Sequence, residues 1–154
     1  MLCVRDTAIG RIAITGDGDY ITHLHLPNKT ELLGGFEKRE SPVIREAYRQ
    51  LELYLDGKLR EFSLPLRAEG TVFMMKVWEE LLKVPYGTVI TYKELAAAAG
   101  RPRAVRAVGT ANARNPIAIF IPCHRVINTG GKLGGFGGGL DLKRYLLDME
   151  AKHS

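Results

Sequence analysis

The chain has 154 residues, of which 45% are hydrophobic and 8% aromatic, and it carries 22 Lys and Arg against 17 Asp and Glu. This composition excludes collagen-like and disordered chains, and the length suffices for one core or for two small domains. The 2 cysteines are too few for a disulfide framework or a four-thiolate metal site, so each is expected to be a free thiol. No apolar run reaches the roughly 18 to 20 residues of a membrane span, and the N-terminus lacks a secretory leader. We therefore expect a cytoplasmic protein with no membrane partner.

The positive charge lies in the second half of the sequence. Residues 1–70 carry 10 basic and 11 acidic side chains, whereas residues 71–154 carry 12 basic and 6 acidic ones. No acidic residue lies between Glu94 and Asp141. A stretch of one sign favours a polyanionic partner, because neutralising phosphates releases counterions and gives affinity that does not depend on sequence. A solubilising surface explains the charge equally well.

Two segments near the N-terminus, 9–15 and 20–26, alternate apolar with polar residues on either side of a Gly- and Asp-rich turn. They predict a β-hairpin with one buried face. Ser41 followed by Pro42 is typical of a helix start, and apolar residues then recur at helical spacing until a glycine ends the pattern. These elements predict a small α+β domain over residues 1–65.

Residues 56–70 are polar and interrupted by glycine and proline, so we expect them to link the first domain to a second one over residues 71–154. The second domain begins with Thr71, which can cap a helix. Apolar residues then recur at helical spacing until Pro85. The pattern predicts an amphipathic helix between these two residues.

Two short helices are predicted to follow. Thr91 and Glu94 form a capping box for the first, which runs to Ala99 before a glycine ends it. Pro102 suits the first turn of the second helix, which we expect to reach about residue 111. Two short helices across a tight turn that contains glycine are typical of a helix-turn-helix.

The second of these helices shows three kinds of face. Val105 and Val108 are predicted to point toward the core. Beside them lies a stripe of small side chains, formed by Ala104, Ala107 and Ala111. Beyond this stripe lies a polar edge, formed by Arg103, Arg106 and Thr110. Such a helix could enter a groove of DNA, because small side chains let a backbone approach closely. A tightly packed alanine helix with solvated arginines is the alternative, and the helix alone leaves both open.

A candidate nucleophile follows an apolar segment, 117–121, that predicts a buried strand. Cys123 lies next to His124 in a stretch without acidic residues, and such surroundings lower the pKa of a thiol. Adjacent residues of an extended chain point to opposite sides, so the sequence leaves open whether the Cys123 sulfur meets the His124 ring directly or through a bridging water. Glu150 is the late carboxylate left to orient the imidazole. The alternative is a buried cysteine that acts only as a small hydrophobic side chain.

Residues 121–127, Ile-Pro-Cys-His-Arg-Val-Ile, strongly resemble the active-site motif of the O6-alkylguanine-DNA alkyltransferases, which repair DNA by direct reversal. The resemblance extends from Thr71 to Glu150 and includes the turn Asn115-Pro116 and a glycine-rich segment. The N-terminal hairpin and helix look like the first domain of that family. The resemblance implies an α+β fold with a small ribonuclease H-like N-terminal domain and a winged-helix-like C-terminal domain that contains the helix-turn-helix.

The resemblance also implies a catalytic set. Cys123 would accept the alkyl group from O6 of guanine, His124 would remove its proton through a water, and Glu150 would hold His124. Asn115 would fix the loop before the active site, and Tyr92 would donate a hydrogen bond or proton to the guanine leaving group. A thioether has no carbonyl for water to attack, so each molecule is expected to act once, as a suicide methyltransferase.

By the same resemblance, the second helix of the pair would lie along the minor groove of double-stranded DNA without reading its sequence. Arg106 would enter the base stack where the target nucleotide has been flipped out. The other DNA-binding residues that the resemblance implies are small or polar: Thr91, Arg103, Ala104, Ala107, Gly109 and Thr110. We expect a monomer that is associated with the nucleoid when it is bound to DNA.

The substrate pocket that the resemblance implies contains Val126, Phe136, Gly137 and Lys143. Backbone carbonyls of Cys123 and Val126 would read the amino group of the alkylated guanine. No cofactor is implied. Some relatives hold zinc in the N-terminal domain, but the residues of that kind in this chain do not reproduce the ligand set, so no metal is expected: Cys3, His23 and His25.

Three other functions are weighed against this one. A non-catalytic alkyltransferase-like protein that binds damaged DNA would share the fold but replace the cysteine, and Cys123 argues against it. A helix-turn-helix regulator would need an effector domain or a dimerisation heptad, and neither is visible. A cysteine hydrolase would need an oxyanion site that the sequence does not reveal.

Overall fold

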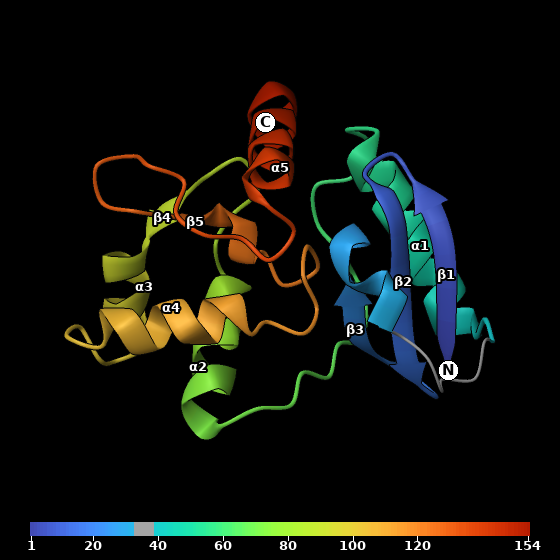
Figure 1. Cartoon of the computed structure of the whole chain (residues 1–154), viewed down its shortest axis with the longest axis horizontal. Coiled ribbons are helices and arrows are strands. Elements are labelled where there is room, and N and C mark those ends of the chain that lie inside the picture. Colours follow the sequence, from blue (N-terminus) through green and yellow to red (C-terminus); the bar gives the residue numbers. More distant parts are fainter. Residues whose placement is uncertain (33–38) are drawn as a thin grey trace. The chain divides into compact units, whose positions relative to one another are not determined.

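The structure is a computed structural model that describes residues 1–32 and 39–154. Helices and strands both occur, which confirms the α+β class (Figure 1). No helix within these described ranges is both long and apolar enough to cross a bilayer.

The described residues divide into two compact units. The first unit is Met1–Ala68 together with Pro116–Phe120, and the second is Glu69–Asn115 together with Ile121–Ser154. The sequence predicted two continuous domains, with boundaries at residues 65 and 71. In the structure, a segment of five residues from the second half belongs to the first unit.

The first unit contains a three-stranded antiparallel sheet in the order β1-β2-β3, with β1 Leu2–Thr7, β2 Gly10–Asp17 and β3 Tyr20–His25. The predicted hairpin corresponds to β2 and β3. A register shift between Thr15 and Gly16 interrupts their pairing. Sequence reasoning missed β1, whose alternating pattern is short and contains charged residues.

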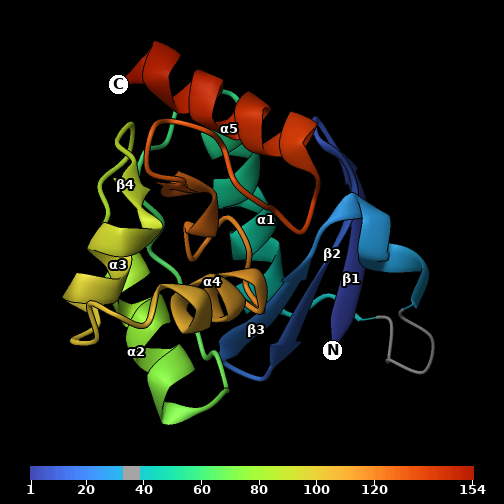
Figure 2. The same ribbon diagram turned by 60° about the vertical axis from the view of Figure 1, so that its left-hand side comes forward.

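Helix α1, Pro42–Leu55, packs against this sheet (Figure 2). The Ser41 hydroxyl accepts a hydrogen bond from the Ile44 backbone N–H, so the predicted cap is confirmed. The Tyr48 hydroxyl donates to the carbonyl oxygen of Cys3 at 2.6 Å. A short 3-10 helix, Pro27–Leu32, follows β3.

Segment Pro116–Phe120 completes the first unit. The Leu24 backbone N–H donates to the Pro116 carbonyl at 3.0 Å, and the Phe120 ring meets the Phe62 ring edge-on with centroids 4.7 Å apart. The prediction of a strand over residues 117–121 was wrong, because only isolated bridges and a turn occur there. The predicted burial is confirmed. Ile119 has a φ of 73°, which is a costly conformation for a β-branched residue.

The second unit consists mainly of helices with one small parallel sheet. Its elements are α2 Val72–Leu81, β4 Ile90–Thr91, α3 Tyr92–Ala98, α4 Val105–Ala113, a 3-10 helix η2 Cys123–Arg125, β5 Val126–Ile127 and α5 Leu140–His153. Strands β4 and β5 pair in parallel. Both predicted caps are confirmed: Thr71 accepts from the Met74 N–H, and Thr91 and Glu94 form a complete capping box.

Helices α2, α3 and α4 pack together, so the predicted pair α3 and α4 rests on a third helix. The Trp78 indole N–H donates to the Ala111 carbonyl at 2.9 Å, which ties α2 to α4. Helix α4 begins at Val105 rather than at Pro102, and its start has no side-chain cap. Val108 is buried as predicted, but the prediction for Val105 was wrong, because this residue is 39% exposed in the first turn.

Candidate active site

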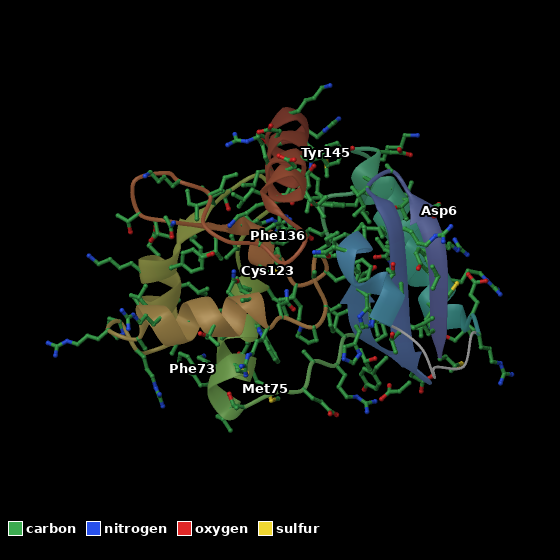
Figure 3. The ribbon with its side chains drawn as sticks, viewed as in Figure 1. Asp6, Phe73, Met75, Cys123, Phe136 and Tyr145 are labelled. Carbon is green, nitrogen blue, oxygen red and sulfur yellow. The ribbon has the colours of Figure 1, made fainter. Side chains whose placement is uncertain are left out.

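Cys123 is the first residue of η2 and lies on the segment between α4 and α5, where Figure 3 labels it. Its side chain is 5% exposed. The backbone is a tight turn here, since the Cys123 N–H donates to the Ile121 carbonyl at 2.8 Å. The strand expected to lead directly into the cysteine is absent, and the expectation of an extended chain at Cys123 and His124 was wrong, because both residues lie in η2.

A fully buried pair follows the cysteine. His124 Nε2 lies 2.7 Å from Glu150 Oε2, and the two residues are 0% and 1% exposed. Burial lowers the pKa of His124, and the Glu150 carboxylate opposes this effect, so the imidazole is neutral at neutral pH. Because the carboxylate accepts a hydrogen bond, we assign the ring proton to Nε2, which makes Nδ1 the basic nitrogen.

Arg125 completes this group, although the sequence analysis assigned it no role in the site. Its guanidinium donates to both carboxylate oxygens of Glu150, at 2.8 Å and 3.0 Å, and to the Val84 carbonyl at 2.8 Å. The Gly87 N–H also donates to Glu150, at 3.1 Å. Glu150 is therefore held by the adjacent residues His124 and Arg125 and by Gly87, all of which are distant from it in sequence. The position of Arg125 directly after His124 was the available signal.

Two asparagines hold the backbone around the cysteine. One lies in α4 and the other lies just after it. Asn115 Nδ2 donates to the Ile121 carbonyl at 2.8 Å, and Asn112 Nδ2 donates to the Cys123 carbonyl at 3.3 Å. The family resemblance pointed to Asn115. Asn112 was missed, because nothing in its local sequence distinguishes it from a helix residue that faces solvent.

Tyr92, the first residue of α3, lies near Asn112 and Cys123. Burial raises the pKa of its phenol, an interaction with the Asn112 side chain opposes the rise, and the negative charge that Cys123 carries when it ionises adds to it. The phenol therefore remains protonated at neutral pH and can donate a hydrogen bond.

Lys143 on α5 is 0% exposed and ties the glycine-rich loop, residues 130–139, to the site. Its ammonium group donates to the Val126 carbonyl at 2.6 Å, to the Gly135 carbonyl at 3.2 Å and to the Leu133 carbonyl. Burial lowers its pKa to about 8. The structure thus brings Val126 and Lys143 together, as the predicted pocket requires.

Phe136 and Gly137 lie in the loop before α5, and Figure 3 shows the Phe136 side chain on the same unit as Cys123. The loop passes close to Tyr92, because a Cβ added at Gly134 would lie 3.0 Å from the Tyr92 ring. Gly134 also has a φ of 71°, which favours glycine.

Most of the predicted DNA-binding residues lie on α4 or directly before it. Exposed members of the set are Arg103, Arg106, Ala107 and Thr110, while Thr91, Ala104 and Gly109 are partly buried. The predicted alanine stripe is divided, because Ala111 is only 1% exposed and packs in the core. A Cβ added at Gly109 would meet no atom within 4 Å, so the protein's own packing does not require glycine there.

Comparisons with known proteins agree on one family. The model of the 6-O-methylguanine DNA methyltransferase ribonuclease-like domain matches residues 4–68, and the model of the DNA binding domain of the same family matches residues 72–152. The ribonuclease-like and DNA-binding character of the predicted fold is thereby confirmed.

Similar proteins match nearly the whole chain. A methylated-DNA--protein-cysteine methyltransferase of Methanosarcina barkeri is 48% identical, and the match covers 94% of this chain and 93% of the relative. The constitutive enzyme of that name from Bacillus subtilis is 42% identical and covers 94% of this chain and 92% of its own. The crystal structure of Mycobacterium tuberculosis OGT in complex with DNA has a TM-score of 0.89 at 41% identity and covers 99% of this chain and 94% of that one. This chain belongs to the 6-O-methylguanine DNA methyltransferase family.

Proposed function

We propose that the protein repairs DNA by transferring the alkyl group of O6-alkylguanine to Sγ of Cys123. The observation that carries this proposal is the buried group of His124, Glu150 and Arg125 beside the cysteine. A neutral imidazole fixed by a carboxylate is suited to accept a thiol proton. Membership of the family, and the names of relatives that match almost the full chain, support the same activity.

The proposed reaction is a single displacement. His124 takes the thiol proton of Cys123 through a water, and the thiolate sulfur then attacks the alkyl carbon. The bond from sulfur to carbon forms as the bond from carbon to O6 breaks, and the electron pair stays on guanine. A proton returns to the guanine, with Tyr92 as the hydrogen-bond or proton donor, so the products are unmodified guanine and an S-alkylcysteine.

The product implies stoichiometric repair. Neither the proposed mechanism nor hydrolysis by water cleaves the thioether, so the sulfur is not regenerated. All residues of the mechanism come from one chain, so we infer that a monomer repairs one lesion.

We further propose that α4 binds the minor groove of double-stranded DNA. The target oxygen lies inside a duplex, so the base must leave the stack before Cys123 can reach it. Arg106 is exposed on α4 next to small residues and is long enough to fill the vacated position. Such contacts do not depend on sequence, and they would keep a cytoplasmic protein associated with the nucleoid.

Transfer of label tests the activity. DNA that contains O6-methylguanine with a labelled methyl group is incubated with protein, and we expect the label to reach the protein at no more than one equivalent. Cys123→Ala should abolish transfer and leave DNA binding nearly unchanged. Transfer to the Cys123→Ala protein, or more than one equivalent to the unchanged protein, would contradict the proposal.

Removing the side chain of Arg106 tests the DNA-binding part. We expect Arg106→Ala to slow transfer from duplex DNA about tenfold, because the extruded base loses its replacement in the stack. Reaction with free O6-benzylguanine needs no extrusion and should change little. Arg114→Ala removes an equal charge at the end of α4 and is the matched control. Equal losses in the two variants would refute a specific role for Arg106.

A further inference from the structure

Asn112 has a buried amide that the proposed mechanism does not use. It lies in the last turn of α4 and is 5% exposed. Its Nδ2 donates to the Cys123 carbonyl, and this bond fixes which side of the carboxamide carries the oxygen. Within the described part of the chain, Oδ1 has no hydrogen-bond donor. A buried polar atom without a partner destabilises a protein, so its presence calls for an explanation.

The Asn112 amide lies beside two residues that are expected to contact the substrate in the proposed reaction. The Cys123 carbonyl lies 3.3 Å from Nδ2, and the Tyr92 phenol interacts with the same side chain. The proposed reaction places the alkylated base against these two residues. A group on that base can therefore reach the Asn112 amide.

The chemistry of the lesion selects one group. Alkylation at O6 removes the proton from N1, so N1, N3, N7 and O6 are all hydrogen-bond acceptors. The only N–H donor that remains on the base is the exocyclic 2-amino group. We infer that Asn112 Oδ1 accepts a hydrogen bond from this amino group and is a specificity-determining residue. The inference rests on the proposed function.

The backbone carbonyls of Cys123 and Val126, which are expected to bind the 2-amino group, each already accept one hydrogen bond within the protein. The Cys123 carbonyl accepts from Asn112, and the Val126 carbonyl accepts from Lys143. Each carbonyl retains a second lone pair, so both can still contribute. Asn112 Oδ1 is a further acceptor, and it differs from them because a substitution can remove it.

A pair of matched substrates isolates this contact. Single-turnover transfer rates are measured on duplexes that contain O6-methylguanine or O6-methylhypoxanthine, which lacks only the 2-amino group. The unchanged protein should prefer the guanine substrate. In Asn112→Leu we expect this preference to fall about tenfold, mainly because the rate on O6-methylguanine falls. The thermal midpoint should change little, since the loss of the donor to the Cys123 carbonyl is offset by the removal of an unsatisfied polar atom.

Asn115→Ala is the matched control. It also removes an amide that holds a backbone carbonyl beside the site, so it should slow both substrates and leave the preference unchanged. If Asn112→Leu likewise slows both substrates equally, the residue only positions Cys123 and the inference fails. Asn112→Met, of similar length, provides the same measurement if the leucine variant does not fold. Equal rates on the two substrates in the unchanged protein would also overturn the inference, whereas no transfer from either would reject the proposed function itself.

Discussion

Glu150→Gln is expected to lower the free energy of unfolding by about 3 to 5 kcal/mol and to slow alkyl transfer at least about a hundredfold. The carboxylate compensates the buried guanidinium of Arg125, which is bonded to both of its oxygens. A neutral amide in its place leaves that positive charge buried and uncompensated. The same change removes the group that fixes the proton on Nε2 of His124. Urea unfolding and single-turnover kinetics measure the two effects.

Two control variants separate the effects on stability and on transfer. The double variant Arg125→Met with Glu150→Leu replaces both charges by apolar side chains, so it should recover most of the stability. It should not recover transfer, because His124 still lacks its carboxylate. Glu46→Gln changes an exposed carboxylate that pairs with Arg49 and should have little effect on stability. A Glu150→Gln protein as stable as Glu46→Gln would show that the buried group does not hold the site together.

Lys143→Met is expected to lower the free energy of unfolding by about 2 kcal/mol at pH 7 and to slow transfer about tenfold. The lysine donates to carbonyls of Val126, Leu133 and Gly135, which join β5 to two points of the glycine-rich loop. Methionine fills similar space but leaves all three carbonyls without this donor. The loss exceeds the gain from no longer burying a charge, because each unsatisfied carbonyl is destabilising.

The pH dependence of the same pair of proteins gives an independent check. The pKa of Lys143 is about 8 in the folded protein, below the ordinary value of 10.5 that it regains on unfolding. Between these pH values the unfolded chain binds more protons than the folded one, so the contribution of Lys143 to stability rises with pH. The difference in stability between the unchanged protein and Lys143→Met should therefore grow from pH 8 to 10. A difference that shrinks over this range would mean that the ammonium group is not desolvated.

Local signals predicted the helix starts well. Ser41, Thr71 and Thr91 each cap the helix that their sequence context indicates, because a cap depends on residues only two or three positions away. The predicted start of α4 was wrong because it also depended on a local signal. No side chain caps it, and Pro102 gave a signal that the tertiary structure does not use.

Long-range contacts explain what the sequence did not reveal. The apolar segment 117–121 has the composition of a buried strand, but a turn with Ile119 at positive φ replaces the extended conformation. Arg125 donates to Glu150 and Asn112 donates to the Cys123 carbonyl, and each partner is distant in sequence. Arginine and asparagine are also common in exposed positions, so their residue types gave no signal. The motif around Cys123 identified the neighbourhood of the site, whereas its partners became visible only once α4 and α5 were folded around it.

The assignment of Pro116–Phe120 to the first unit has a consequence for synthesis on the ribosome. The sheet and α1 come from the first 55 residues, yet Leu24 and Phe62 find their partners only when residues 116–120 have emerged. We therefore expect the nascent N-terminal unit to keep part of its apolar surface uncovered until residues 116–120 have left the ribosome. A chaperone that binds nascent chains would meet this surface first, and slow codons placed before residue 116 would prolong its exposure.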